Sequence, residues 1–246
     1  MSNIVVVIPT YNEAENIGRM VDTLVGQEFD KIAGHKMMLL VVDDRSPDGT
    51  GKIVKEKMKK YTNLHLLEGD KKGLGVAFTR GFKYAIENLK ADAVMEMDGD
   101  FQHDPADVKR FVSEFDKGFD YILGSRFIKG GSIPNDWGFY RTFLSVVGNW
   151  FIRIVLWLRD IHDLTTGFRL ARVKGFVDQI DFSKILSKSY AYKIHLLYEM
   201  RHQGAKIKEI PIKFVSREKG WSKMDSDDFI ESLRVVLAIR TRGLLS

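Results

Sequence analysis

The sequence predicts an α/β protein with a mostly parallel central sheet and helices on both of its faces. Two observations lead to this prediction. Short apolar runs alternate along the chain with segments of helical spacing, and these runs are continuous, as in strands that are buried on both faces. A length of 246 residues, 44% of them hydrophobic and 29% charged, suits one domain with a sizeable core. We therefore expect a single domain over residues 1–246.

The first half of the chain contains these elements in regular alternation. Strands are predicted at 3–8, 36–42, 64–68, 93–97 and 120–124. Helices are predicted at 13–29, 51–61 and 75–89. Polar segments follow three of the strands, at 9–13, 43–48 and 98–102. Because ligands bind at the carboxyl ends of parallel strands, we expect these three segments to line one crevice.

The second half of the chain differs in charge and in apolar pattern. Residues 1–125 hold 17 basic and 21 acidic side chains, whereas residues 126–246 hold 21 basic and 12 acidic ones. Segment 139–158 is mostly apolar and aromatic, with a polar residue at every fourth position: Arg141, Ser145, Asn149 and Arg153. This pattern predicts a wide apolar helix with a narrow polar stripe, which suits either a membrane interface or a buried core. Strand-like residues follow at 205–215, and a last amphipathic helix is predicted at 228–239.

The segment from Asp98 to Gln102 places two carboxylates and an amide at the end of a predicted buried strand. Mg²⁺ and Mn²⁺ prefer oxygen ligands of this kind and often keep diphosphate oxygens in their shells. The chain has no cysteine, so thiolate ligands are excluded. Asp100 and Gln102 are candidate metal ligands, although a solvated Asp-Gly turn gives the same pattern. The neighbouring His103 is more typical of a turn residue than of a catalyst.

Two further polar segments suit the binding of a nucleotide. Tyr11 offers an aromatic face to a base and Glu13 a carboxylate acceptor, although Glu13 also suits the first turn of a helix. One carboxylate of the Asp43-Asp44 pair is a candidate acceptor for ribose or base hydroxyl and amine groups. No Gly-x-Gly-x-x-Gly follows the first strand and no P-loop motif is present, which disfavours those two nucleotide-binding classes.

Basic residues of the second half are candidate phosphate contacts, because guanidinium forks and lysine charges match phosphate oxygens. They are Arg126, Arg141, Arg217 and Lys223. Together with a metal ion they would neutralise a leaving nucleoside diphosphate. An acceptor that is already a phosphate anion would need no strong general base.

Six short motifs occur in an order that is shared with a known family. They occupy residues 9–13, 41–50, 72–75, 98–102, 124–126 and 166–169. The chain resembles family 2 glycosyltransferases over nearly its whole length, and within them the polyprenol-phosphate branch that includes the dolichol-phosphate mannose synthases. The resemblance implies a glycosyltransferase A-type fold with amphipathic membrane-interface helices. It also implies transfer of mannose from GDP-mannose to dolichyl or another polyprenyl phosphate with inversion, which gives a β-linked product.

The resemblance further implies roles for individual residues. The donor would be bound by Pro9, Tyr11, Glu13, Val41, Asp43, Asp98, Gly99, Asp100, Arg126, Arg217 and Lys223. Mg²⁺ or Mn²⁺ would be held by Asp100 and Gln102, and the lipid phosphate would face Arg126, Arg141 and Ser145. Asp100, Arg126 and Arg217 would be catalytic. The sequence leaves two roles open for Asp163, to position the acceptor or to brace the site, and bracing is the favoured one. On this basis residues 1–125 form the nucleotide-sugar and metal half, and residues 126–246 the acceptor and membrane-interface half.

The same resemblance sets expectations about partners and location. We find no secretory signal in residues 1–9 and no transmembrane anchor after Ser226, which predicts a peripheral membrane protein on the cytosolic face. That membrane would be the endoplasmic reticulum in a eukaryote or the plasma membrane in a prokaryote. Small membrane-anchoring subunits are candidate partners, and nucleic acid is not. Two alternatives remain: a polyprenol-phosphate glucosyltransferase that uses UDP-glucose, and a non-catalytic subunit that binds lipid or nucleotide.

Overall fold

In the computed structural model, residues 1–134, 136–216 and 226–242 are described, and one sheet runs through them. Its strands are β1 (Ser2–Thr10), β2 (His35–Asp43), β3 (Leu64–Glu68), β4 (Ala93–Glu96), β5 (Tyr121–Ser125), β6 (Arg169–Arg172) and β7 (Ile207–Pro211). Their order across the sheet is β3-β2-β1-β4-β6-β5-β7. Strand β6 runs antiparallel to both of its neighbours, and the other pairs are parallel. The predicted mostly parallel sheet is confirmed.

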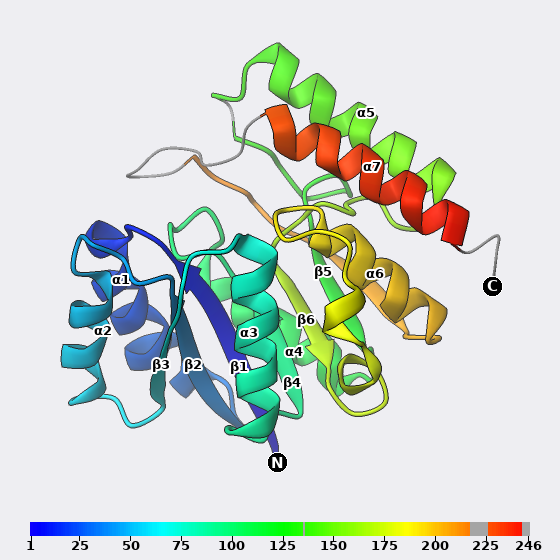
Figure 1. Ribbon diagram of the computed structural model, residues 1–246. Helices are drawn as coiled ribbons and strands as arrows, with labels where there is room; N and C mark the ends of the chain where they lie inside the picture. Colours follow the sequence, from blue (N-terminus) through cyan, green and yellow to red (C-terminus); the bar gives the residue numbers. More distant parts are fainter. Residues whose placement is uncertain (135, 217–225, 243–246) are drawn as a thin grey trace.

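Helices cover both faces of this sheet (Figure 1). One face carries α1 (Ala14–Thr23), α2 (Thr50–Met58) and α4 (Val108–Asp116), and the other carries α3 (Leu74–Glu87) and α6 (Tyr192–His202). Two further helices, α5 (Phe139–Val155) and α7 (Ser226–Arg242), lie side by side above the carboxyl-end edge of the sheet. This arrangement confirms the predicted α/β architecture.

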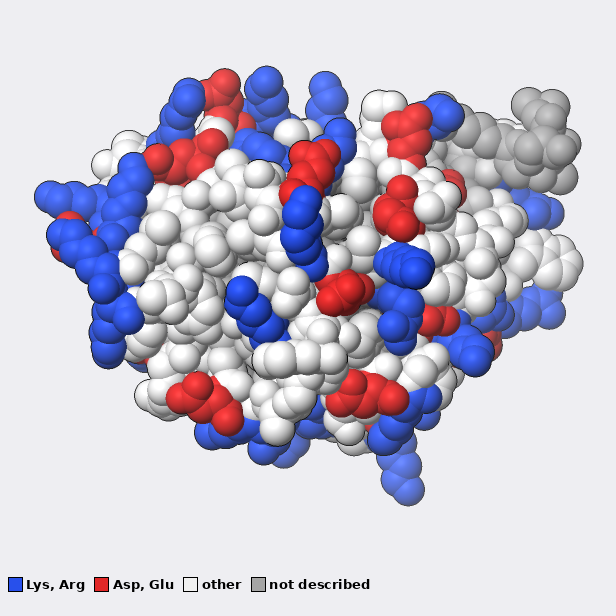
Figure 2. All heavy atoms as spheres, turned by 90° about the horizontal axis from the view of Figure 1, so that it is seen from below, with Lys and Arg blue, Asp and Glu red and all other residues white. Residues whose placement is uncertain are grey.

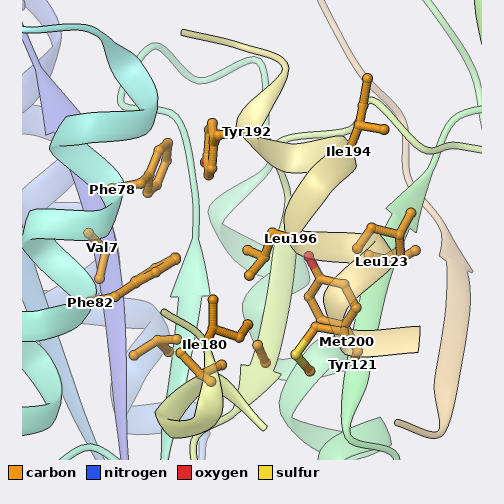
Figure 3. Packing of buried hydrophobic residues seen from close by; sticks show 14 of the residues in the cluster. Val7, Phe78, Phe82, Tyr121, Leu123, Ile180, Tyr192, Ile194, Leu196 and Met200 are labelled. Carbon is orange, nitrogen blue, oxygen red and sulfur yellow. The ribbon is translucent and has the colours of Figure 1, made fainter. Parts of the chain in front are cut away.

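The central strands are apolar throughout because both of their faces are buried. In β1, Val5 and Val7 face the layer of α3, whereas Ile4, Val6 and Ile8 face the layer of α1. Figure 3 shows the first of these layers, with Val7 near Phe78 and Phe82 of α3. The helix packs close to the sheet because Gly81 has no side chain; a Cβ there would lie 2.6 Å from Cγ1 of Val7.

The predicted helix at 13–29 is regular only in its first part. After α1 the chain continues as a π-helical turn over Leu24–Glu28 and a 3-10 turn over Phe29–Lys31. Three elements, α4, β6 and α6, have no counterpart in the prediction from sequence. Strand β6 reads Arg-Leu-Ala-Arg, so it lacks the apolar run that identified the other central strands.

Helix α5 is not a buried core helix, which was one of the two interpretations of its pattern. Phe139 is 86% exposed and Trp150 is 61% exposed. Asn149 of its polar stripe points inward, because this side chain is buried and donates from Nδ2 to Thr165 Oγ1 at 3.3 Å. Among the described helices, none combines the length and apolar character needed to cross a lipid bilayer.

The end of the molecule opposite α5 and α7 exposes charged side chains of both signs. Figure 2 shows this end from below, with lysine and arginine side chains interspersed with aspartate and glutamate over the visible face. Mixed charges of this kind create no extended field of one sign. The surplus of basic residues in the second half of the chain therefore does not form a single basic patch on this face.

Candidate active site

The segments after β1 and β2 meet at the carboxyl-end edge of the sheet. Thr10 Oγ1 donates to Asp43 Oδ1 at 2.8 Å, and the backbone nitrogen of Asp44 donates to Thr10 O at 3.0 Å. Asp43 also accepts from Ser46, at 2.9 Å from the backbone nitrogen and 2.6 Å from the hydroxyl. The buried Asp43 carboxylate thus joins two of the three segments that were expected to line one crevice.

Asp44 and Tyr11, which belong to the same two segments, each contact a basic side chain. Asp44 accepts from Arg80 Nη2 at 2.7 Å, and burial raises the pKa of the Asp44 carboxyl even though Arg80 opposes the shift. The ammonium of Lys71 lies 3.7 Å from the centre of the Tyr11 ring, within the range of a cation–π interaction. One face of the aromatic platform predicted for a base is therefore covered by a lysine.

Three predicted donor contacts have clear structural positions. Glu13 precedes α1, where its backbone nitrogen donates to Thr50 Oγ1 at 3.0 Å and its carboxylate accepts from Asn16 Nδ2 at 3.1 Å. Pro9 lies in β1 at the same edge, opposite Val42 of β2. Val41 is fully buried in the sheet, so its side chain contributes to core packing.

The turn after β4 brings the predicted metal ligands together. Asp100 is buried, and its Oδ1 accepts from the backbone nitrogen of Gln102 at 3.1 Å. The Gln102 amide donates from Nε2 to Val215 O at 3.0 Å, which fixes its orientation. Gly99 lets this turn lie close to β1, since a Cβ there would be 3.0 Å from Ile8 Cγ2. Because Asp100 and Gln102 are buried, the segment is not the solvated Asp-Gly turn that was the alternative interpretation.

Asp100 and Gln102 are suitable ligands for a hard divalent cation. A buried carboxylate and an oriented amide are oxygen donors of the kind that Mg²⁺ and Mn²⁺ prefer. Within the described ranges, His, Cys, Asp and Glu side chains form no group of three or more that would hold an ion alone. An ion at Asp100 and Gln102 would thus need water or phosphate oxygens to complete its shell.

His103 has a structural position beside this turn. Its Nδ1 accepts from the backbone nitrogen of Asp98 at 3.2 Å, and its ring stacks on Phe168 with 4.7 Å between the ring centres. Burial lowers the pKa of His103 to about 4, so the imidazole is neutral near pH 7. These contacts agree with the expectation that His103 is a turn residue.

Arg126 follows β5 and is held by a buried carboxylate. Asp163 accepts from Arg126 Nε and Nη2 at 2.7 Å each, and from the Arg126 backbone nitrogen at 3.0 Å. Arg126 Nη2 also donates to Thr165 Oγ1 at 2.9 Å, and Thr165 in turn accepts from Asn149 of α5. Burial alone would raise the pKa of Asp163, but Arg126 outweighs it and holds that pKa below its usual value. Asp163 therefore braces Arg126.

Several predicted contacts are not placed by the structure. Arg217 and Lys223 lie outside the described residues. Arg141 belongs to the first turn of α5, but its side chain is outside the described part of the structure. Ser145 is half-buried on α5 and lies one turn before Asn149, whose Nδ2 donates to Ser145 O at 2.9 Å.

A buried polar network that the sequence did not reveal lies behind the turn after β4. Tyr192 donates to Glu96 Oε2 at 2.6 Å, and the ring of Tyr192 stacks on Phe78 of α3 (Figure 3). Arg169 donates from Nη1 to Tyr121 Oη at 3.0 Å and to Lys193 O at 2.6 Å. Because α6 is buried around most of its circumference, it has no apolar stripe that could have indicated this network.

Comparison with known proteins identifies relatives along the whole chain. Residues 5–178 match the family model described as glycosyl transferase family 2. The chain is 36% identical to a polyprenol monophosphomannose synthase of Mycolicibacterium smegmatis, over 98% of this chain and 88% of that protein. It is 35% identical to an undecaprenyl-phosphate mannosyltransferase of Micrococcus luteus, over 98% and 97% of the two chains. A dolichol-phosphate mannosyltransferase of Pyrococcus furiosus is 34% identical over 93% of this chain and 61% of its own length.

Solved structures share the fold at lower identity. Mannosyl-3-phosphoglycerate synthase from Rubrobacter xylanophilus superposes with a TM-score of 0.69 and 16% identity, over 98% of this chain and 75% of that one. A glucosyl-3-phosphoglycerate synthase from Mycobacterium tuberculosis, solved with Mn²⁺ and UDP, gives 0.66 and 18%, over 97% and 80%. The resemblance and the glycosyltransferase A-like fold expected from the sequence are both confirmed. The chain is a glycosyltransferase and belongs to glycosyl transferase family 2.

Proposed function

We propose that this glycosyltransferase moves mannose from GDP-mannose to a polyprenyl phosphate such as dolichyl phosphate, with inversion and with Mg²⁺ or Mn²⁺. The names of its relatives at 34–36% identity support the sugar and the class of acceptor. One structural observation carries the proposal. On the inward side of α5, Asn149 donates to Thr165, and the same threonine hydroxyl accepts from Arg126. The outward side of α5 exposes aromatic residues. A lipid phosphate requires these two environments next to each other.

Each residue of the site would have a separate role in the reaction. Asp100 and Gln102 would hold the divalent ion, which would neutralise the leaving nucleoside diphosphate. Thr10 and Asp43 order the segments beside which the nucleoside would bind, and Arg126 provides a braced cation for phosphate oxygens. The acceptor phosphate attacks the anomeric carbon directly, so no side chain needs to remove a proton. The neutral, buried His103 agrees with a mechanism that lacks a histidine base.

We further propose that α5 and α7 lie on the cytosolic surface of a membrane. The exposed large apolar residues of these helices, together with Trp157 shortly after α5, define an apolar strip made of Phe139, Phe143, Val146, Val147, Trp150, Ile154, Trp157, Ile230 and Leu237. Two cations flank its end: Arg159 lies 4.9 Å and Arg240 5.8 Å from the Trp157 ring centre. Aromatic residues with nearby arginines suit the boundary between headgroups and acyl chains. Small anchoring subunits would add to this attachment.

The double substitution Phe143→Ser and Trp150→Ser is expected to weaken binding to lipid vesicles at least about 10-fold. The reason is that burial of each aromatic ring in the interface contributes roughly 1.5–3 kcal/mol. Co-sedimentation with vesicles of phosphatidylcholine and phosphatidylglycerol measures the effect. Met58→Ser is a matched control, because Met58 is an exposed apolar residue on α2, away from the apolar strip. Equal sedimentation of the double variant and the wild type would contradict the membrane proposal.

The reaction itself is tested by identifying its product. Purified protein is incubated with radiolabelled GDP-mannose, dolichyl phosphate and Mg²⁺ or Mn²⁺, and the lipid phase is then extracted. We expect labelled mannose in that phase and a β-anomeric configuration by nuclear magnetic resonance of the isolated product. An α-linked product would contradict direct displacement. No labelled lipid with any polyprenyl phosphate, with and without membrane fractions, would contradict the proposed acceptor.

A further inference from the structure

The residue between the two proposed metal ligands has an unusual backbone conformation. Phe101 has a φ of 64°, in the left-handed region that bulky side chains rarely adopt. On one side of it is Asp100, and on the other is Gln102, whose backbone nitrogen donates to Asp100 Oδ1 at 3.1 Å. This hydrogen bond closes a tight turn, and glycine suits its left-handed position best. A phenylalanine there carries backbone strain that its side-chain contacts must offset.

The Phe101 ring is held by two contacts. The guanidinium carbon of Arg19 lies 4.0 Å from the ring centre, within the range of a cation–π interaction. The half-buried ring also packs against the apolar layer of α1. Because Arg19 belongs to α1, the stacked pair joins this helix to the turn after β4. Both contacts depend on the direction of the ring, which the left-handed backbone sets.

The conformation at Phe101 determines how the two ligands are arranged. Rotation about its N–Cα bond moves Asp100 relative to Gln102, and the Gln102 amide is itself fixed on Val215 O at 3.0 Å. A different φ at residue 101 would therefore turn the carboxylate away from the amide. Apparent affinity falls with the fraction of molecules that hold the binding-competent arrangement. Residues outside the ligand shell that maintain this arrangement thus contribute to metal binding.

We propose that Phe101 and Arg19 are positioning residues for the divalent ion: the stacked ring holds the left-handed backbone at residue 101 and so directs Asp100 and Gln102 toward one site. Neither of the two contacts the ion in this proposal. The inference rests on the proposed assignment of Asp100 and Gln102 as metal ligands. It does not depend on the identity of the base, the hexose or the lipid.

Titration with Mn²⁺ in the absence of nucleotide tests this inference, with the free ion followed by electron paramagnetic resonance. Phe101→Ala and Phe101→Gly both remove the ring and differ by one methyl group. Alanine avoids the left-handed region, so Phe101→Ala is expected to weaken Mn²⁺ binding about 5- to 30-fold. Glycine adopts this region without strain but is more flexible, so Phe101→Gly is expected to weaken Mn²⁺ binding about 2- to 5-fold.

The contribution of Arg19 is measured in two backgrounds. Arg19→Met keeps a helix-forming side chain without the guanidinium and is expected to weaken Mn²⁺ binding about 2- to 5-fold. The same substitution added to Phe101→Gly should have no further effect, because the ring on which Arg19 stacks is absent. Lys60→Met is the matched control and should bind Mn²⁺ like the wild type. Lys60 lies 4.7 Å from the Tyr61 ring centre and precedes β3, at the opposite edge of the sheet from the turn after β4.

Equal Mn²⁺ affinities of Phe101→Ala and Phe101→Gly would overturn the inference, since the backbone conformation would then not matter. Wild-type affinity of Arg19→Met, or a further loss when it is added to Phe101→Gly, would also overturn it. Urea unfolding identifies a purely structural role, in which stability falls while the folded variants keep wild-type Mn²⁺ affinity; that result contradicts the inference too.

The variant Asp100→Asn separates this inference from the metal assignment on which it rests. If Asp100→Asn binds Mn²⁺ weakly while the Phe101 and Arg19 variants bind like the wild type, only the inference is wrong. If Asp100→Asn binds Mn²⁺ like the wild type, the ligand assignment is wrong and the inference fails with it. The absence of Mn²⁺ binding by the wild type would contradict both.

Discussion

Replacing Asp100 by asparagine is expected to lower the rate of the proposed mannose transfer at least about 100-fold. Asparagine lacks the charge with which Asp100, as a proposed ligand, would hold the divalent ion that neutralises the leaving nucleoside diphosphate. The fold should be retained. The carboxylate oxygen of Asp100 accepts a hydrogen bond from the Gln102 backbone, and an asparagine side-chain oxygen can accept the same bond. The effect should therefore appear in catalysis and metal affinity rather than in stability.

The measurement is the initial rate of lipid labelling over a titration of Mn²⁺, after treatment with a chelator. Wild-type activity should disappear with the chelator and return with the metal, whereas Asp100→Asn should need far more metal or show no return. Asp116→Asn is a suitable control, because that carboxylate is exposed at the end of α4 and pairs with His35. Wild-type rates for Asp100→Asn at low metal concentration would remove Asp100 from the set of ligands.

The substitution Asp163→Asn is expected to reduce the free energy of unfolding by about 3–5 kcal/mol, the usual cost of leaving one member of a buried ion pair without its partner. Asp163 is fully buried and accepts two hydrogen bonds from the Arg126 guanidinium and one from its backbone. Urea unfolding measures the change. Asp160→Asn removes a carboxylate that pairs with Arg201 at 2.9 Å but is 56% exposed, and it should cost less than about 1 kcal/mol.

The contribution of Asp163 to the free energy of unfolding is expected to decrease at low pH. Its pKa in the folded protein is lower than the ordinary value of 3.8. Its stabilising contribution is therefore complete above pH 3.8 and is lost as the pH falls below that value, through the folded-state pKa. The difference in stability between the wild type and Asp163→Asn should stay constant from pH 7 to pH 5 and shrink at lower pH. If the free energy of unfolding of Asp163→Asn at pH 7 is within about 1 kcal/mol of the wild-type value, the position of Arg126 does not depend on Asp163.

The parallel part of the fold could be predicted because its strands are buried on both faces. β1 and β2 are continuous apolar runs in the sequence, and β3 was predicted with its observed bounds, Leu64–Glu68. Strand β6 could not be predicted in the same way. Its two arginines break the apolar pattern, and its place between β4 and β5 depends on pairing between distant segments. Helix α6 lacks a distinct polar face, so periodicity did not reveal it.

The candidate site was partly predictable for a related reason. The acidic turn after β4 follows a recognisable strand, so its position at the carboxyl-end edge was foreseeable. The sequence could not show that Asp163 accepts hydrogen bonds from the guanidinium and backbone of Arg126. The polar stripe of α5 was recognised, but the inward direction of Asn149 depends on its contact with Thr165, which is distant in the sequence.

Competition between two labelled donors tests the proposed function most directly. GDP-[¹⁴C]mannose and UDP-[³H]glucose are supplied together with dolichyl phosphate and Mg²⁺ or Mn²⁺, and both labels are counted in the extracted lipid. We predict that the lipid contains ¹⁴C from mannose, little ³H, and neither label after chelation of the metal. Predominant transfer of ³H would show that the donor is a UDP-sugar. Lipid labelling that is unaffected by chelation, or the absence of both labels, would contradict metal-dependent mannosyl transfer to a polyprenyl phosphate.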